Sequence, residues 1–230
     1  TYVDQMPSKA ESLVIGISGG IDSSVSSTLC AMTGLKTIVL SMPIKQKENQ
    51  HDLSLKHQKW LVEKFKNVEA HTIHLDELFK SFSSTLNKFD NEHGFANSRA
   101  RLRMTTLYQV AAANNGIVVG TGNKVEDFGV GFYTKYGDGG VDISPIADCN
   151  KTDVWEMGKE LGILKEIIDA PPTDGLWDDG RTDEGQLGFK YEDLEDAMKN
   201  PKSPHRKEYE KIRKQNLHKM EPIPVCKIPN

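Results

Sequence analysis

Cysteine, long apolar runs and an excess of positive charge are all scarce in this 230-residue chain. The three cysteines, Cys30, Cys149 and Cys226, lie far apart and form no C-x-x-C pair, which argues against a disulfide framework and a zinc knuckle. No apolar run approaches the roughly 20 residues of a membrane-spanning helix, and no charged-then-apolar leader is seen. We therefore expect a reducing, cytoplasmic location and no membrane partner. Because the first residue is Thr1, we also expect the natural N-terminus to be trimmed or missing.

The charge balance excludes a general nucleic-acid-binding surface. A formal net charge of -4 and a pI near 6.0 give no basic field, so a nucleic-acid partner would need a local patch that composition does not show. Small molecules are the expected partners. The length allows a substantial core, and we expect one domain over 1–230.

Strand-like and helical patterns alternate along the first half of the chain. Apolar, β-branched runs occupy 13–17, 37–42, 68–75 and 117–120, and helical patterns occupy 23–33, 51–66, 76–88 and 98–114. This alternation predicts an α/β fold, a doubly wound and mostly parallel sheet with helices on both faces and ligands at the carboxyl ends of its strands.

The second half of the chain is less regular. Helices are expected at 151–162, 191–199 and 205–219, whereas 131–142 and 170–188 are rich in Gly, Asp and Pro and are predicted to be long loops. Because these two loops carry aromatic residues, including Trp177, we interpret them as loops that cover a substrate.

A glycine turn follows the first strand, in the stretch LVIGISGGIDSSVSSTLCAM at 13–32. Asp22-Ser23-Ser24 offers N-cap chemistry for the helix after Ser18-Gly19-Gly20. The N–H groups in the first turn of a helix lack internal partners and carry partial positive charge, so an anion such as phosphate is expected there. Asp22 would repel a bare phosphate unless a divalent cation lies between them, so the turn predicts magnesium with polyphosphate. Taken alone, a single Ser-Gly-Gly fits an ordinary strand-to-helix turn equally well.

Seven segments, in this order along the chain, resemble a known family. They are SGGIDSS, RARLRM, GTGNKVE, YTKYGDGGVD, NKTDVWEMGKELG, PPTDGLW with TDEGQLG, and HKMEPIP. The chain resembles ammonia-dependent NAD synthetase from about Val14 to Pro224. The SGGxDS loop alone is shared by a superfamily of ATP pyrophosphatases, and the TKYGDGG-x-D segment points to NAD synthetase. The resemblance implies a Rossmann-like fold of the adenine nucleotide alpha hydrolase type and a homodimer.

The resemblance also implies a two-step reaction. Family members convert nicotinic acid adenine dinucleotide to NAD: the nicotinate carboxylate attacks the α-phosphorus of ATP and releases pyrophosphate, and ammonia then displaces AMP. The expected co-substrate is therefore ATP and the expected cofactor is Mg²⁺. Longer relatives carry an amidase domain that releases ammonia from glutamine. This chain has no room for one, so free ammonia or a separate donor is implied.

The family's ATP and metal residues can be matched to positions in this sequence. The matched ATP-binding residues are Ser18, Gly19, Gly20, Asp22, Ser23, Ser24, Thr121, Lys151 and Thr173. Asp22 and Glu126 match the magnesium carboxylates. Between Glu126 and Lys135 the chain has one residue more than the family pattern, so Asp127 is an alternative second ligand.

The residues matched to the acid substrate are Arg101, Lys135, Asp142, His218 and Lys219. Arg101 and Lys135 supply cations for a substrate with phosphates and a carboxylate, and Asp142 can accept hydrogen bonds from ribose hydroxyls or from ammonia. The expected catalytic set is Asp22, Lys151 and Asp142. Trp177 either caps an aromatic ring of a ligand or pins its own loop.

Several alternatives stay open on the sequence. The motifs do not exclude amidation of nicotinic acid mononucleotide, or another pyrophosphate-loop ligase such as a GMP synthetase core. A tRNA-modifying thiolase would need reactive cysteines and a basic RNA surface, and neither is apparent. A non-catalytic nucleotide-binding module would have no use for two metal carboxylates.

Overall fold

The centre of the molecule is a four-stranded parallel sheet. The computed structural model describes residues 2–6, 8–44, 48–172 and 183–228. The strands are β1 (Ser12–Gly16), β2 (Lys36–Ser41), β3 (Val68–Thr72) and β4 (Gly116–Val119), in the order β3-β2-β1-β4. β1 pairs in parallel with both β2 and β4, which makes it an inner strand. Its apolar residues are buried, as expected for a parallel sheet covered on both faces.

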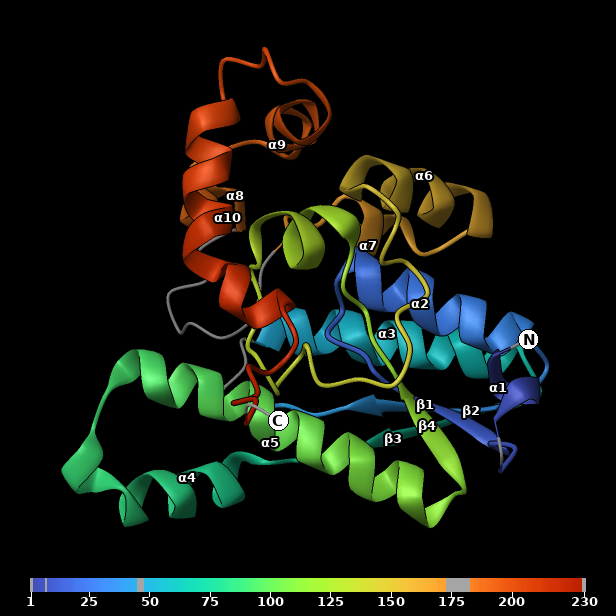
Figure 1. The fold of residues 1–230 in the computed structure, drawn as a ribbon. Helices are drawn as coiled ribbons and strands as arrows, with labels where there is room; N and C mark the ends of the chain where they lie inside the picture. Colours follow the sequence, from blue (N-terminus) through green and yellow to red (C-terminus); the bar gives the residue numbers. More distant parts are fainter. Residues whose placement is uncertain (1, 7, 45–47, 173–182, 229–230) are drawn as a thin grey trace.

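Helices cover both faces of this sheet, as predicted (Figure 1). α2 (Ile21–Met32) and α3 (Glu48–Lys64) lie on one face, and α4 (Asp76–Thr85) and α5 (Glu92–Ala113) lie on the other. Successive strand residues alternate between the two layers because side chains of a strand point to opposite faces. Ile15 packs in the core on the α2 and α3 side with Leu61, whereas Val14 packs with Phe79 and Ala111 on the α4 and α5 side. The predicted doubly wound α/β fold is therefore confirmed.

The remaining helices form a second group beside the sheet. They are α6 (Lys151–Leu161), α7 (Lys165–Ile168), α8 (Asp183–Leu187), α9 (Tyr191–Lys199) and α10 (Arg206–Met220). α6 and α7 share a core cluster with α2. Figure 1 shows α8, α9 and α10 together at one side of the molecule, where Tyr191, Leu194 and Tyr209 pack with Val125 and Val130. Among the described residues, no helix is both long and apolar enough to cross a membrane.

Short elements were not foreseen from the sequence. α1 (Tyr2–Gln5), the 3₁₀ turn η1 (Asn87–Phe89), α7 and α8 are single turns, too short for hydrophobic periodicity to reveal. α8 lies inside the stretch 170–188 that was predicted to be a loop, so that prediction was wrong for Asp183–Leu187.

The most informative unforeseen element is the π-helix η2 (Lys124–Val130). It follows β4 and carries Glu126 and Asp127. A π-helix holds one residue more between bonded groups than an α-helix does, and such turns often occur at functional sites. η2 overlaps the stretch 126–135, where the sequence has one residue more than the family pattern.

Candidate functional site

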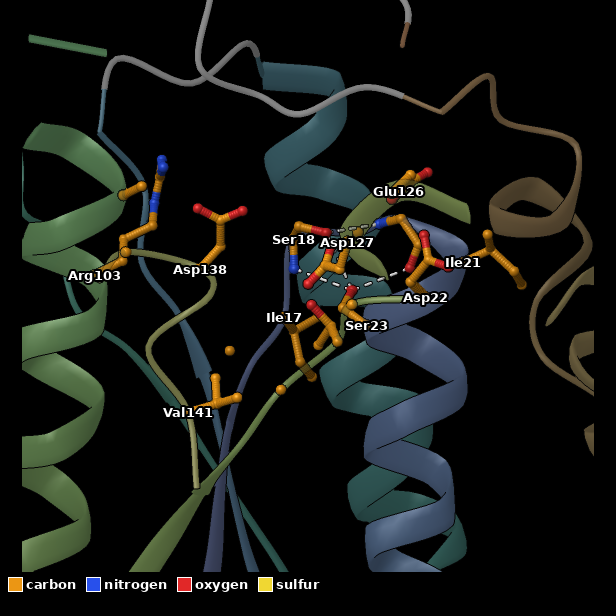
Figure 2. Close-up of a pocket in the computed structure, with 18 of the residues that line it drawn as sticks. Ile17, Ser18, Ile21, Asp22, Ser23, Arg103, Glu126, Asp127, Asp138 and Val141 are labelled. Atoms are coloured by element: carbon orange, nitrogen blue, oxygen red, sulfur yellow. Dashed lines mark hydrogen bonds between the residues drawn. The ribbon is translucent and has the colours of Figure 1, made fainter. Parts of the chain in front are cut away.

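A cavity of about 280 Å³ opens where β1 and β4 end. Its lining comes from the turn after β1, the chain after β4 with η2, the loop at 132–141, one side of α5 and residues 170–172, together with Met42, Leu53 and Lys151. Figure 2 shows Ser18, Asp22, Ser23, Glu126 and Asp127 on one side of the cavity and Arg103 of α5 on the other. Parallel strands place ligands at their carboxyl ends, so the cavity lies where the fold predicts a ligand.

The turn after β1 differs in one respect from its prediction. Gly20, in extended conformation, is the N-cap of α2, and no side chain caps the helix. The expectation that Asp22-Ser23-Ser24 caps α2 was wrong, because these residues already belong to its first turn. The Ser23 hydroxyl instead donates to the Gly20 carbonyl at 3.0 Å and accepts from the Ser18 amide at 3.2 Å.

These bonds give the turn a shape that can receive an anion. Gly19 has φ 91°, a left-handed conformation that favours glycine. The first-turn N–H groups of α2 are then available to an anion, since no side chain caps them. Ser18, Gly19, Gly20, Asp22 and Ser23 all line the cavity. Ser24 is buried, and its hydroxyl donates to the Gly20 carbonyl at 2.9 Å, so it stabilises the turn from behind.

Lys151 joins the two predicted metal carboxylates. It opens α6, next to the N-cap Asn150, and its side chain is only 1% exposed. Its Nζ atom lies 2.5 Å from Asp22 Oδ2 and 2.9 Å from Glu126 Oε1. Burial alone would lower the pKa of Lys151, but the negative charges of Asp22 and Glu126 outweigh burial and the pKa is raised. Lys151 is therefore a buried ammonium ion in the cavity wall.

Two residues that the sequence reasoning missed hold these carboxylates. Asn123 is fully buried; its Nδ2 donates to Asp22 Oδ1 at 3.2 Å, and its Oδ1 caps η2 by accepting from two backbone amides. Tyr191 of α9 donates from its hydroxyl to Glu126 Oε1 at 2.5 Å, and its ring centroid lies 5.0 Å from Lys151 Nζ. Asn123 stands within the GTGNKVED segment and could have been found as a cap residue. Nothing local in the sequence marks Tyr191.

Further carboxyl groups make the cavity strongly acidic. Asp127 and Asp138 also line it, beside Asp22 and Glu126. Burial, followed by the charges of Asp138, Glu126 and Asp22, raises the pKa of Asp127 well above its usual value. Asp127 approaches the backbone so closely that a Cβ on Gly122 would lie 1.9 Å from its Oδ2. Four carboxyl groups therefore line a cavity that holds the Lys151 ammonium ion and the Arg103 guanidinium, an imbalance that favours binding of a further cation.

The donor set fits magnesium. Mg²⁺ prefers oxygen ligands and is usually held by one or two carboxylates together with substrate phosphates. Asp22 and Glu126 supply such a pair, beside a turn suited to phosphate. Among the described residues, no group of three or more His, Cys, Asp or Glu forms a metal cage, and a magnesium ion carried in with ATP does not need one.

Four predicted substrate residues, none of which lines the cavity, come together from different parts of the chain, and we call this group the rim. The Arg101 guanidinium on α5 donates to the Lys135 carbonyl at 3.3 Å, and Lys135 Nζ donates to the His218 carbonyl in the last turn of α10 at 2.8 Å. Lys219 donates to the carbonyls of Gly131 and Tyr133. The sequence reasoning thus selected residues that the fold brings together.

The other predicted residues are placed differently. Thr121 lines the cavity. Asp142 is not among the lining residues: its carboxylate accepts from the Val118 amide at 2.7 Å and from the Tyr108 hydroxyl at 3.0 Å, beside β4. Thr173 and Trp177 lie outside the described residues.

Comparisons with known proteins show the family of this chain. The family model described as NAD synthase matches residues 1–228. The NH(3)-dependent NAD(+) synthetase of Carboxydothermus hydrogenoformans is 40% identical over 192 residues, which cover 81% of this chain and 76% of that protein. The corresponding protein of Alkaliphilus oremlandii is 36% identical, over 95% of this chain and 90% of its own.

Solved structures share the fold of this chain. An NMN synthetase from Francisella tularensis has a TM-score of 0.84 and 34% identity, covering 96% of this chain and 90% of its own. An NH3-dependent NAD synthetase from Campylobacter jejuni, 24% identical, shares the fold with a TM-score of 0.77 over 98% of this chain and 93% of its own. The chain therefore belongs to the NAD synthase family of ATP-using, ammonia-dependent ligases.

Proposed function

We propose that this chain amidates nicotinic acid adenine dinucleotide to NAD with ammonia, by way of an adenylated carboxylate. The observation that carries the proposal is Lys151, buried between Asp22 and Glu126 in the cavity wall beside the phosphate-type turn. The relatives of this chain from C. hydrogenoformans and A. oremlandii are NH(3)-dependent NAD(+) synthetases.

The first step activates the acid. A free carboxylate is a poor acyl donor because its leaving group would be oxide, whereas an acyl adenylate releases AMP, a stable phosphate monoester. The departing pyrophosphate needs donors and positive charge. The turn at Ser18-Gly19-Gly20 and Lys151 supply them. Ser23, whose hydroxyl donates here to the Gly20 carbonyl, is a proposed further ATP contact together with Thr121 and Thr173. Ser24 contributes by holding the turn.

Mg²⁺ would be held by Asp22 and Glu126 and would neutralise charge on the phosphates. Lys151 is already a cation between these two carboxylates, so they form a site suited to positive charge. Asp127 stands one residue further along η2 and lines the same cavity. We propose that Asp127 adds negative charge to the cavity and that Glu126 is the metal ligand, because Glu126 is the one that pairs with Lys151.

The acid substrate is proposed to bind at the rim formed by Arg101, Lys135, His218 and Lys219. These side chains provide cations and donors for phosphates and a carboxylate. Asp142 is proposed to act beside them as an acceptor for ribose hydroxyls or for ammonia, although it is engaged here by Val118 and Tyr108. We also propose a homodimer, which sedimentation velocity would test.

A second candidate substrate is nicotinic acid mononucleotide. The likeness to the F. tularensis structure, which is an NMN synthetase, favours it. The two acids share the reacting nicotinate and differ in the adenylate half. The cavity described above is therefore compatible with adenylation and amidation of either acid.

The deciding experiment compares the two acids directly. The protein is incubated with ATP, Mg²⁺, ammonium and each acid, and AMP, pyrophosphate and the amide are measured by mass. We expect AMP, pyrophosphate and NAD in equal amounts, and a higher kcat/KM for the dinucleotide. Asp22→Asn should remain folded, because Gly20 caps α2, but should no longer release pyrophosphate. ADP and phosphate as products, or normal turnover by Asp22→Asn, would contradict the proposal.

A further inference from the structure

The π-helix η2 ends in backbone carbonyls that have no partner within the helix. In a π-helix each carbonyl pairs with an amide five residues ahead, and here the Gly131 amide donates to the Glu126 carbonyl. The carbonyls of Phe128, Gly129 and Val130 belong to the last turn, where no further helical amide follows. Such end carbonyls pair with water or with donors from elsewhere in the fold.

Helix α10 provides those partners. Arg213 donates from Nη1 to the carbonyls of Phe128 and Gly129, the latter at 2.7 Å, and Asn216 donates to the Val130 carbonyl at 3.0 Å. Positions 213 and 216 are three apart, so both side chains lie on one face of α10. One face of α10 thus caps the end of the helix that carries Glu126 and Asp127.

The close approach of the two helices depends on Gly131. Its φ is 71°, and a Cβ at this position would lie 2.6 Å from the Asn216 Cβ. A residue with a side chain would therefore push α10 away from η2. The contact between η2 and α10 therefore requires glycine at position 131.

The same helix also contacts the proposed substrate rim. One turn beyond Asn216, the His218 carbonyl accepts from Lys135, and Lys219 donates to the Gly131 and Tyr133 carbonyls at 2.8 and 2.9 Å. α10 therefore contacts both the segment that carries the carboxylates and the segment that carries Lys135.

We propose that Arg213 and Asn216 are positioning residues, which hold Glu126 and Asp127 in the cavity by capping η2. The proposal rests on the proposed role of Glu126 in binding magnesium with ATP. Neither residue lines the cavity, so each acts through η2 and not on the ligand.

The test uses Arg213→Gln and Asn216→Ala, with Arg213→Lys as the conservative variant and Lys214→Gln, an exposed position on the same helix, as the control. Calorimetry with Mg²⁺ and ATP should show at least fivefold weaker metal binding in Arg213→Gln and Asn216→Ala, an intermediate value in Arg213→Lys and no change in Lys214→Gln. The KM for ammonia should stay within twofold in all four.

Amide hydrogen exchange separates positioning from general loss of stability. Exchange should accelerate at 125–132 in the capping variants and stay unchanged in β1 and β4. Uniform acceleration, or wild-type metal binding by a folded variant, would overturn the proposal. If Arg213→Gln does not fold, Asn216→Ala gives the same comparison. Failure of the proposed function would look different, because wild-type protein would then bind Mg²⁺ and ATP with no dependence on Asp22 or Glu126.

Discussion

Replacing Lys151 by methionine removes the ammonium ion and keeps a side chain of similar length. Asp22 and Glu126, with side chains 17% and 14% exposed, then face each other without their shared cation. Breaking a buried ion pair by removing one partner costs about 3–5 kcal/mol of stability. For a chain of this size each kcal/mol lowers Tm by about 2–4 °C, so Lys151→Met should melt about 6–20 °C below wild type.

Magnesium should restore part of this loss. With Lys151 gone, a divalent cation no longer competes with an ammonium ion for the two carboxylates. A ligand at one hundred times its Kd adds about 2.7 kcal/mol to the stability of the folded state. We therefore expect Mg²⁺ alone, without ATP, to raise the Tm of Lys151→Met by several degrees and that of wild type by less.

Thermal melts followed by circular dichroism, with and without Mg²⁺, measure both effects. Lys124→Met is the matched control, because Lys124 pairs with Asp148 at 2.7 Å at the surface, where Asp148 is 96% exposed. Exposed pairs contribute little to stability because water screens them, so this variant should melt close to wild type. If Lys151→Met melts like Lys124→Met, or if Mg²⁺ stabilises it no more than wild type, the reasoning about the buried carboxylates is refuted.

Three further predictions concern other parts of the molecule. Glu126→Gln should raise the Mg²⁺ concentration needed for turnover far more than Asp127→Asn, because of the two only Glu126 pairs with Lys151. Equal, mild effects in an activity titration would show that Glu126 is wrongly assigned as the second metal ligand. Burial lowers the pKa of His57 from 6.5 to about 4. Between these pH values the unfolded chain therefore binds more protons than the folded protein. The free energy of unfolding should then fall by about 3 kcal/mol in total as pH decreases from about 6.5 to about 4. In urea melts His57→Gln should lose less stability over this window than wild type, and an equal loss would count against the assignment. Turnover should follow the concentration of neutral NH₃ as pH rises, since only the neutral form has a lone pair for attack, and glutamine alone should give no product; efficient use of glutamine by the purified chain would contradict this.

The sequence by itself determined the sheet and the position of the turn after β1, although not which residue caps α2. Runs such as 13–17 are apolar on both faces, which in a parallel sheet means cover on both sides, and the structure has strands within a residue or two of all four predicted starts. The strongly periodic helix at 191–199 was predicted at its observed bounds. The local order of apolar and polar residues was sufficient here, because the hydrophobic periodicity of a strand or helix is set by a few neighbouring residues.

Only the tertiary structure decided how the site is assembled. The bonds from Lys151 to Asp22, from Tyr191 to Glu126 and from Arg213 to η2 join residues 129, 65 and about 85 positions apart. No local propensity encodes such pairs, because they form when separate elements pack together. The π-helix is a similar case: the neighbouring Asn123 caps its start, but its end carbonyls accept hydrogen bonds from α10, a helix that is distant in the sequence.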